Sequence, residues 1–335
     1  MCRAPLFGII SEMRTLLVGY KAADLTAKML EGDVTCHVLD VYHRHAIEKV
    51  WHAKCICSAH LPEGPWDLVK FHTGPKVMAG ELSLDLLQEI HLLKPAKFEL
   101  DFVGRERDRN DLLSKVKDDP DRIRSFKAEW PASVPGGKKL MFTSYPGCFC
   151  HRRLDEGGLA LAEVVSKDLS KSSISNIQHP VSNIQPSTSQ PSTFNLLDMG
   201  CGCGLVGLLV ADRLKEGDRT SVSLVMVDSH SRAVEAAGEN AAKFGIAAEV
   251  ILADDGSPAR MDGTFDVFVG NPPYYSDYRI ADVFLETAKR ALKPGGVCYT
   301  VCKNAAGLEP VQKRYFPEVD VIKRRGYAVL KSVRN

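Results

Sequence analysis

The sequence has almost no net charge and no long apolar run. Its 43 lysine and arginine residues are balanced by 42 acidic residues, which gives a formal net charge of +1. An overall basic field that would indicate nucleic acid is therefore excluded, although a local basic face is not. No stretch approaches the roughly 20 apolar residues that a membrane helix needs, and Arg3 and Pro5 interrupt the stretch where a signal peptide would lie. We expect a cytoplasmic, monomeric protein without membrane association.

The cysteines also lack the spacing of a metal site. Six of the ten form Cys-x-Cys pairs, namely Cys55 with Cys57, Cys148 with Cys150, and Cys201 with Cys203. Zinc sites favour cysteines separated by about two to four residues, with a second pair at matching spacing. We therefore expect reduced thiols and no bound metal.

Residues 166–193 stand apart from the rest in composition. Ser, Pro, Gln and Thr dominate, and the tetrapeptide Ser-Asn-Ile-Gln occurs at 175–178 and again at 182–185. Such a segment cannot bury enough apolar surface to order itself. It predicts a disordered, flexible insertion.

The rest of the chain alternates strand-like and helix-like stretches, which indicates α/β architecture with a mainly parallel sheet. After the insertion, the expected strands are Asn195–Met199, Ser223–Val227, Ala248–Leu252, Phe265–Val269 and Val297–Cys302, with Val319–Ile322 and Ala328–Ser332 as a closing antiparallel pair. The expected helices there are Leu205–Leu214, Ser231–Phe244 and Ile280–Leu292. Before the insertion, the expected strands are Thr15–Val18, His37–Val41, Lys54–Ser58, Asp67–Phe71 and Phe98–Val103, and the expected helices are Asp24–Leu30 and Glu81–Leu92.

The two halves agree in register as well as in order. Asp67 and Asp266 occupy matching strand positions, and each is followed at the same distance by the proline of a Leu-Lys-Pro triplet. This repeat favours an internal duplication, with a first domain over residues 1–140 and a second over residues 141–335. The first copy has a single glycine, Gly19, where the second has several. Because a backbone without those glycines cannot approach a nucleoside closely, we expect the first domain to be a scaffold or substrate-binding domain without cofactor.

A glycine-rich turn follows the first strand of the second half. It contains Asp198, Gly200, Gly202 and Gly204, and a helix begins directly after it. Glycines let the backbone pass beside a ligand, and the helix N-terminus offers N–H groups to it. This turn is the first candidate cofactor site.

Two acidic residues follow the next strands. Asp228 ends the second strand, where its carboxylate could accept from a ribose diol, and Asp254 follows the third, where it could accept from an adenine amino group. Gly202, Gly204 and Gly207 with Asp228 also fit the dinucleotide fingerprint. The glycines alone therefore leave a nicotinamide cofactor and S-adenosylmethionine both open.

The fourth strand is followed by Asn271, Pro272, Pro273 and Tyr274. Open α/β sheets bind ligands at the carboxyl ends of their strands. Two prolines stiffen the loop, so the Asn side chain and the Pro272 carbonyl can offer two acceptors to the two hydrogens of an NH₂ group. Tyr274 can stack on a flat substrate. This loop favours S-adenosylmethionine over a nicotinamide cofactor. It predicts methyl transfer to an exocyclic amino group, accelerated by positioning and preorganised electrostatics.

With these motifs, the second half resembles the class I methyltransferases with an Asn-Pro-Pro-aromatic loop. More narrowly, it resembles the bacterial ribosomal RNA guanine-N2 methyltransferases, both type C, which acts on the small ribosomal subunit, and its type G relatives, which act on the large one. The segment from Tyr145 to Gly157 resembles that family's Pro-Gly-x-Phe stretch followed by Leu-Asp-x-Gly. The family more often has Phe at the position of Tyr274, and it lacks the 166–193 insertion.

The resemblance implies two tandem Rossmann-like class I methyltransferase domains, the first degenerate and the second catalytic. It implies S-adenosylmethionine as cofactor and guanine N2 of small-subunit ribosomal RNA as target. The implied cofactor residues are Phe149, Leu154, Asp155, Gly157, Gly200, Gly202, Gly204, Asp228 and Asp254. Asn271 is implied to hold the target amine.

Two other functions remain open at this point. A glutamine-N5 methyltransferase of release factors also uses an Asn-Pro-Pro-Tyr loop, but its N-terminal part is expected to be a small helical bundle. An RNA-binding assembly factor without catalysis is the second, although the intact glycines, Asp228 and Asn271 argue against it. Lys323–Arg325 could touch phosphate, whereas acidic residues are interleaved throughout Arg105–Lys127, which indicates a solvated face.

Overall fold

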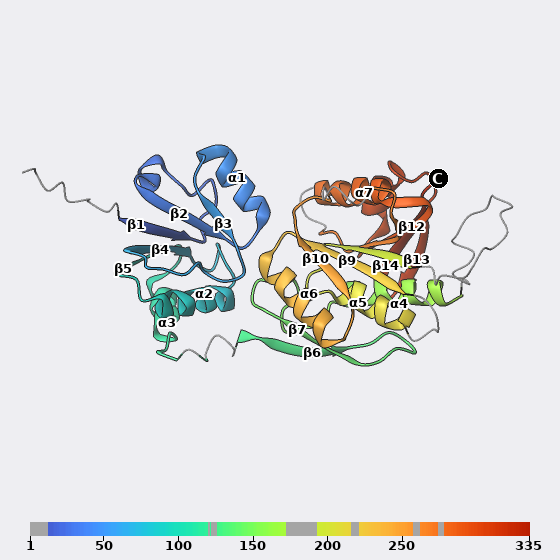
Figure 1. The fold of residues 1–335 in the computed structure, drawn as a ribbon, viewed down its shortest axis with the longest axis horizontal. Helices are drawn as coiled ribbons and strands as arrows, with labels where there is room; N and C mark the ends of the chain where they lie inside the picture. The colour runs from blue at the N-terminus through green and yellow to red at the C-terminus, as the bar shows by residue number, and fades with distance from the viewer. Residues whose placement is uncertain are drawn as a thin grey trace, which may run out of the picture. The chain divides into compact units, whose positions relative to one another are not determined.

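The computed structural model divides the chain into two compact units, Met1–Phe126 and Lys127–Asn335 (Figure 1). It describes residues 13–119, 121, 126–171, 193–215, 221–256, 262–273 and 278–335. The division lies before the expected boundary at 140/141. The expected boundary falls inside the second strand of an antiparallel pair, residues 128–132 and 140–144, and this pair packs on the second unit.

The first unit is a five-stranded parallel sheet covered by helices on both faces (Figure 1). Its elements are β1 (Arg14–Val18), η1 (Ala27–Leu30), β2 (Asp33–Val38), α1 (Val41–Trp51), β3 (Cys55–Cys57), β4 (Leu68–Thr73), α2 (Gly80–Leu93), β5 (Lys97–Phe102) and α3 (Glu106–Ser114). The strand order is β3-β2-β1-β4-β5. Apolar residues of η1 and α1 pack on one face, and those of α2 and α3 pack on the other.

Two expectations for this unit were wrong. The strand expected over His37–Val41 ends at Val38, because the Asp40 side chain accepts a hydrogen bond from the Tyr42 backbone N–H and caps α1. The sequence analysis missed that helix. The helix expected over Asp24–Leu30 is reduced to the single 3₁₀ turn of η1.

The second unit has a seven-stranded sheet and a separate two-stranded hairpin. Its elements are β6 (Ala128–Ala132), β7 (Leu140–Ser144), α4 (Glu156–Lys171), β8 (Phe194–Met199), α5 (Leu205–Lys215), β9 (Val222–Asp228), α6 (Ser231–Lys243), β10 (Ala248–Leu252), β11 (Phe265–Gly270), α7 (Arg279–Ala291), β12 (Leu292–Cys302), α8 (Ala305–Lys313), β13 (Asp320–Arg324) and β14 (Tyr327–Val333). The order is β10-β9-β8-β11-β12-β14-β13, and β14 is antiparallel to both of its neighbours. The expected closing antiparallel pair is thereby confirmed.

The central strands β8 and β11 of the large sheet are buried on both faces, as in other α/β proteins, whereas the edge strand β13 is mostly exposed. Alternate residues of β8 show the two sides: Leu196 packs with α4, α5 and α6, and Leu197 packs with α7 and α8. Figure 1 shows α4, α5 and α6 on one side of this sheet and α7 on the other. The loops that follow the parallel strands lie at the carboxyl edge of the sheet.

The strand orders of the two units agree, as duplication predicts. β3-β2-β1-β4-β5 in the first unit corresponds to β10-β9-β8-β11-β12 in the second. The prediction of two tandem Rossmann-like units is thereby confirmed for the fold.

The insertion predicted over residues 166–193 was wrong at its start, because α4 continues to Lys171. Val165 and Leu169 extend the apolar face of the helix onto the core, so this part of the polar-looking segment is anchored. The remainder of the predicted insertion, up to residue 192, lies outside the described residues. Within the described parts of the chain, no helix has both the length and the apolar character to cross a bilayer.

Candidate active site

The expected site residues of the second unit gather at the carboxyl edge of its sheet. The glycine loop follows β8, Asp228 ends β9, and Asn271 follows β11. Since β8 lies between β9 and β11, these three segments are neighbours in space although they are far apart in the chain. Ligands bind at this edge of open α/β sheets.

Gly202 presents the most open part of the glycine loop. Its φ is +55°, and a Cβ added there would meet no atom within 4 Å. Gly200, by contrast, lies against the Phe284 ring, where an added Cβ would come within 2.6 Å of a ring carbon. A side chain at Gly202 would project into open space in front of the loop, so glycine keeps the backbone accessible there.

Asp228 ties this loop to the neighbouring strand. Its Oδ2 accepts from the Gly202 backbone N–H at 2.8 Å, and its Oδ1 accepts from the His230 N–H at 2.9 Å. Two backbone donors therefore fix the carboxylate beside the loop. The orientation suits the ribose role predicted for this residue.

Asp198 supports the loop from below. Its side chain is buried, and Oδ2 accepts from the Gly207 backbone N–H of α5 at 2.8 Å. Burial raises the pKa of this carboxyl from 3.8 to about 7, with the Asp228 charge adding to the effect and the Gly207 hydrogen bond opposing it. Asp198 thus contacts the first turn of α5, the helix that follows the glycine loop.

Asp198 is expected to make stability depend on pH. Because its folded pKa exceeds the ordinary 3.8 of a free carboxyl, the folded chain holds a proton that the unfolded chain has released. The stabilisation is complete below the lower value and is lost as the pH rises to about 7. Asp198→Asn keeps an acceptor for Gly207 and cannot titrate. Urea unfolding from about pH 5 to about pH 8 should show the wild type losing free energy of unfolding relative to this variant; parallel pH profiles would contradict the assignment.

Asn271 and Asp155 form the second part of the site. Asn271 Nδ2 donates to Asp155 Oδ2 at 2.8 Å, and the Gly157 backbone N–H donates to Asp155 Oδ1 at 3.0 Å. Burial raises the pKa of the Asp155 carboxyl, and these hydrogen bonds oppose the shift. The lead-in segment and the Asn-Pro-Pro loop, predicted separately, therefore meet.

The other predicted residues border this centre or lie outside the described residues. Phe149 has a 67% exposed side chain, and Leu154 is partly buried against the core. Asp254 is two residues beyond Leu252, the β10 partner of Asp228, so it lies at the same sheet edge. Pro272 and Pro273 follow Asn271, whereas Tyr274 falls outside the described part of the chain.

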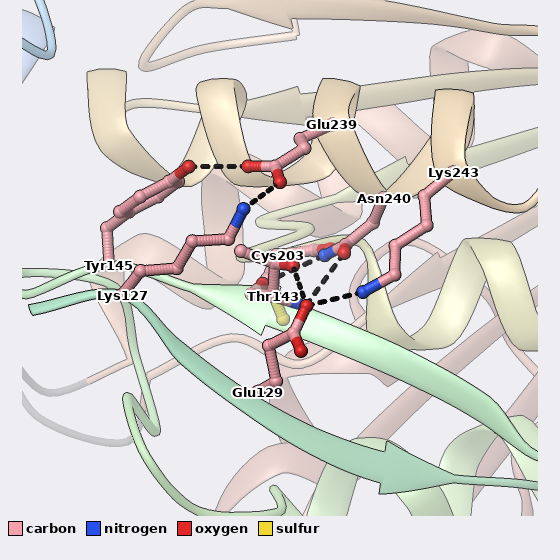
Figure 2. Close-up of polar contacts among 8 residues, drawn as sticks. All are labelled: Lys127, Glu129, Thr143, Tyr145, Cys203, Glu239, Asn240 and Lys243. Carbon is pink, nitrogen blue, oxygen red and sulfur yellow. Dashed lines mark hydrogen bonds and ion pairs between the residues drawn. The ribbon is translucent and has the colours of Figure 1, made fainter. Parts of the chain in front are cut away.

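Sequence reasoning missed Asn240, a fully buried residue of α6 (Figure 2). Its Oδ1 accepts from the Thr143 backbone N–H at 2.8 Å, and its Nδ2 donates to the carbonyls of Thr143 and Cys203, each at 2.9 Å. One side chain thus joins β7 to the glycine loop. The signal was available, because Asn240 lies on the same helical face as the buried Ala233, Ala236 and Ala237.

Charged contacts surround this junction on the exposed side of α6. Glu239 accepts from Lys127 and from the Tyr145 hydroxyl, and Lys243 Nζ donates to Glu129 Oε1 at 2.6 Å (Figure 2). The hairpin is also held by aromatic packing, with the Trp130 and Phe142 rings stacked at 5.3 Å. The segment that leads into the site is therefore fixed to α6. Among the described residues, no cluster of His, Cys, Asp and Glu could hold a metal ion.

Comparison with known proteins agrees with this arrangement. A family model described as "Methyltransferase small domain" matches residues 181–331. Ribosomal RNA small subunit methyltransferase C from Stutzerimonas stutzeri is 24% identical over an alignment covering 99% of this chain and 97% of that protein. The protein of that name from Pseudomonas syringae is 30% identical, over 51% of this chain and 44% of its own length.

A solved structure extends the comparison to both units. It is a 16S rRNA N2 methyltransferase from T. thermophilus in complex with AdoMet and guanosine, with a TM-score of 0.73 and 18% identity. The match covers 99% of this chain and 90% of that one, so the complete two-unit fold is shared. Residues 181–331 of the chain therefore match the methyltransferase small domain, and its two units have the fold of that solved structure.

Proposed function

We propose that the second unit binds S-adenosylmethionine and methylates an exocyclic amino group, guanine N2 of small-subunit ribosomal RNA. The observation that carries the proposal is the Asn271–Asp155 hydrogen bond of 2.8 Å. It fixes the amide of Asn271 through its nitrogen, at the sheet edge where the glycine loop also lies. An acceptor held in this way can grip an amine hydrogen.

The described residues fit the cofactor. Gly202 leaves open space in front of the loop, and Asp228 is fixed beside it. Asp228 would hold the ribose and Asp254 the adenine, while Phe149, Asp155 and Gly157 would border the cleft. When bound, S-adenosylmethionine supplies an electrophilic methyl group.

Replacing Asp228 by alanine is expected to weaken S-adenosylmethionine binding by about 1.5–3 kcal/mol, the size of a charge-assisted hydrogen bond. The variant also loses the acceptor for Gly202 N–H, so the loop is held less firmly. Calorimetry with S-adenosylmethionine and S-adenosylhomocysteine measures the loss, with one site per wild-type chain. Asp282→Ala on α7 is a suitable control, because that carboxylate pairs with Arg314. Binding of NADH in place of S-adenosylmethionine would overturn the cofactor assignment.

The site residues favour positioning over acid–base chemistry. Asn271 Oδ1 and the Pro272 carbonyl are the two acceptors proposed for the amine hydrogens, and they favour the pyramidal nitrogen that accepts a methyl group. No strong base is needed, because the proton can leave after the nitrogen has become cationic. A paired base cannot present its amine to this pocket, so the target must be unpaired or flipped out.

Guanine N2 is favoured over the glutamine amide by the first unit and by the relatives. A release-factor methyltransferase was expected to begin with a helical bundle, whereas this chain begins with a parallel sheet. The relatives reported above are named for ribosomal RNA methylation. Such a substrate is available in the cytoplasm, where we propose that the protein acts as a monomer.

We propose that the first unit takes no cofactor. Its counterpart of the glycine loop contains the single glycine Gly19 and has Lys21 at the position of Gly202, the glycine with open space in front of it in the second unit. His72, which occupies the place of Asn271, stacks on Tyr20 at 5.0 Å, and its Nδ1 lies 2.9 Å from Asp101 Oδ2. These contacts fill the edge that is open in the second unit, which supports a role as scaffold or RNA-binding domain.

The test of the proposed function is transfer of labelled methyl to small-subunit ribosomal RNA that lacks the modification, followed by nucleoside digestion. N2-methylguanosine is the expected product. Label found in N6-methyladenosine or in release-factor protein would contradict the proposed substrate but not the proposed mechanism. Absence of transfer to RNA and protein would favour a non-catalytic assembly factor.

A further inference from the structure

Lys303 follows β12 directly and lies at the same sheet edge as Asn271. Thr300 of β12 pairs with Gly270, the residue before Asn271. On the other side of β12, Cys302 pairs with Ala328, which places Tyr327 beside Lys303. Two residues that the function above does not use are thereby brought next to the proposed catalytic loop.

The Lys303 side chain is held on an aromatic ring. Its Nζ lies 4.2 Å from the centroid of Tyr327, within the range of a cation–π contact. Tyr327 in turn reaches the site, since a Cβ built at Gly157 would lie 3.1 Å from its Cε1. Gly157 donates to Asp155, which accepts from Asn271. A continuous set of contacts therefore connects Lys303 with the amine-binding amide.

The neighbouring arginines carry neutralised charges, in contrast to Lys303. Arg324 donates to Glu163, and Arg325 donates to Glu163 at 3.0 Å and to Glu156 at 2.9 Å. These pairs anchor the β13–β14 turn to α4. No carboxylate among the described residues pairs with Lys303, whose side chain is exposed. Arg324 and Arg325 of the basic triplet are thus structural, whereas Lys303 at the carboxyl edge is an available cation.

The position of Lys303 in the sheet separates it from the cofactor residues. The glycine loop, Asp228 and Asp254 follow β8, β9 and β10, which lie on one side of β11. β12 and β14 lie on the other side. A ligand of Lys303 is therefore a group of the substrate, and the group in RNA that pairs with an exposed ammonium is a phosphate.

We propose that Lys303, seated on Tyr327, binds a backbone phosphate beside the target nucleotide. The proposal rests on the proposed function. Tyr327 limits the positions that the flexible lysine can take, so the ammonium is already near its phosphate when the nucleotide enters. Phosphate contacts fix register and orientation without reading sequence. Lys303 is thus a substrate-positioning residue, and its replacement should change the affinity for RNA.

The test uses the whole chain and a fluorescent fragment of unmodified small-subunit ribosomal RNA, titrated over a series of salt concentrations. Lys303→Ala is expected to weaken RNA binding about threefold to tenfold and to reduce the slope of log affinity against log salt by about 0.7, as for one phosphate contact. The KM for RNA should rise by the same factor, with kcat nearly unchanged. Lys303→Arg should retain most of the affinity, and Tyr327→Leu should lose part of it.

Lys289→Ala is the matched control. Lys289 also lies over a ring, 5.5 Å from the Phe316 centroid, but it is in the last turn of α7, away from the carboxyl edge. Its RNA affinity and salt slope should match those of the wild type. If Lys303→Ala has the wild-type slope and KM while the wild type methylates RNA, the phosphate contact is refuted and the function stands. If the wild type transfers no methyl to RNA, the proposed function and the contact are refuted together.

Discussion

Asn271→Ala is expected to slow methyl transfer by about two to three orders of magnitude, which is the usual loss for one transition-state hydrogen-bond partner. The variant removes the proposed amine acceptor and leaves the glycine loop and Asp228 in place. Affinity for S-adenosylmethionine should therefore stay close to the wild-type value. Single-turnover transfer of labelled methyl to unmodified ribosomal RNA measures the rate, and calorimetry measures the cofactor affinity.

Two further variants test whether the loss of rate is specific to the Asn271 amide. Asp155→Ala removes the acceptor that holds Asn271 Nδ2, so the same step should slow, but by less than in Asn271→Ala. Asn195→Ala removes an asparagine from the start of β8, at the amino edge of the sheet, and should leave the rate unchanged. Full turnover by Asn271→Ala would show that the loop does not hold the amine.

Asn240→Leu is expected to give the largest loss of stability. Leucine has a similar size but leaves the Thr143 N–H, the Thr143 carbonyl and the Cys203 carbonyl without their partner in a buried place. Each unsatisfied buried group costs about 1–3 kcal/mol, so the free energy of unfolding should fall by about 3 kcal/mol or more. Urea unfolding of the whole chain measures the change, with tryptophan fluorescence reporting Trp130 of the second unit together with Trp51 and Trp66 of the first.

The control for Asn240→Leu is a variant of Lys243, which lies about one helical turn further along α6. Lys243→Ala breaks an ion pair with Glu129 of β6 on the exposed side of α6 and should cost at most about 1 kcal/mol. Asn240→Leu should also weaken S-adenosylmethionine binding, because Cys203 belongs to the glycine loop. Equal stabilities of the two variants would mean that the Asn240 hydrogen bonds contribute little beyond packing.

The sequence was sufficient to locate the strands of the two larger sheets along the chain, because their residues are apolar and are separated by clear turns, but it did not predict β6 and β7. Its prediction of the glycine loop and the Asn-Pro-Pro loop at one edge needed only the rule that parallel strands end together. Local spacing could not show that Asp155 meets Asn271, since 116 positions separate them and an insertion lies between. The predicted start of the insertion was wrong for a related reason. Ser166 and Lys167 are polar, but Val165 and Leu169 of the same helix pack on the core.

The hairpin of β6 and β7 has a consequence for dividing the protein into fragments. A fragment beginning at residue 141 would lack β6, and with it the Trp130 ring that stacks on Phe142. It would also lack Lys127 and Glu129, the partners of Glu239 and Lys243 on α6. The Thr143 strand would then be held to the glycine loop by Asn240 without its hairpin partner. A separately expressed catalytic unit must therefore begin ahead of Lys127, and protease cleavage that leaves an active fragment should fall upstream of that residue.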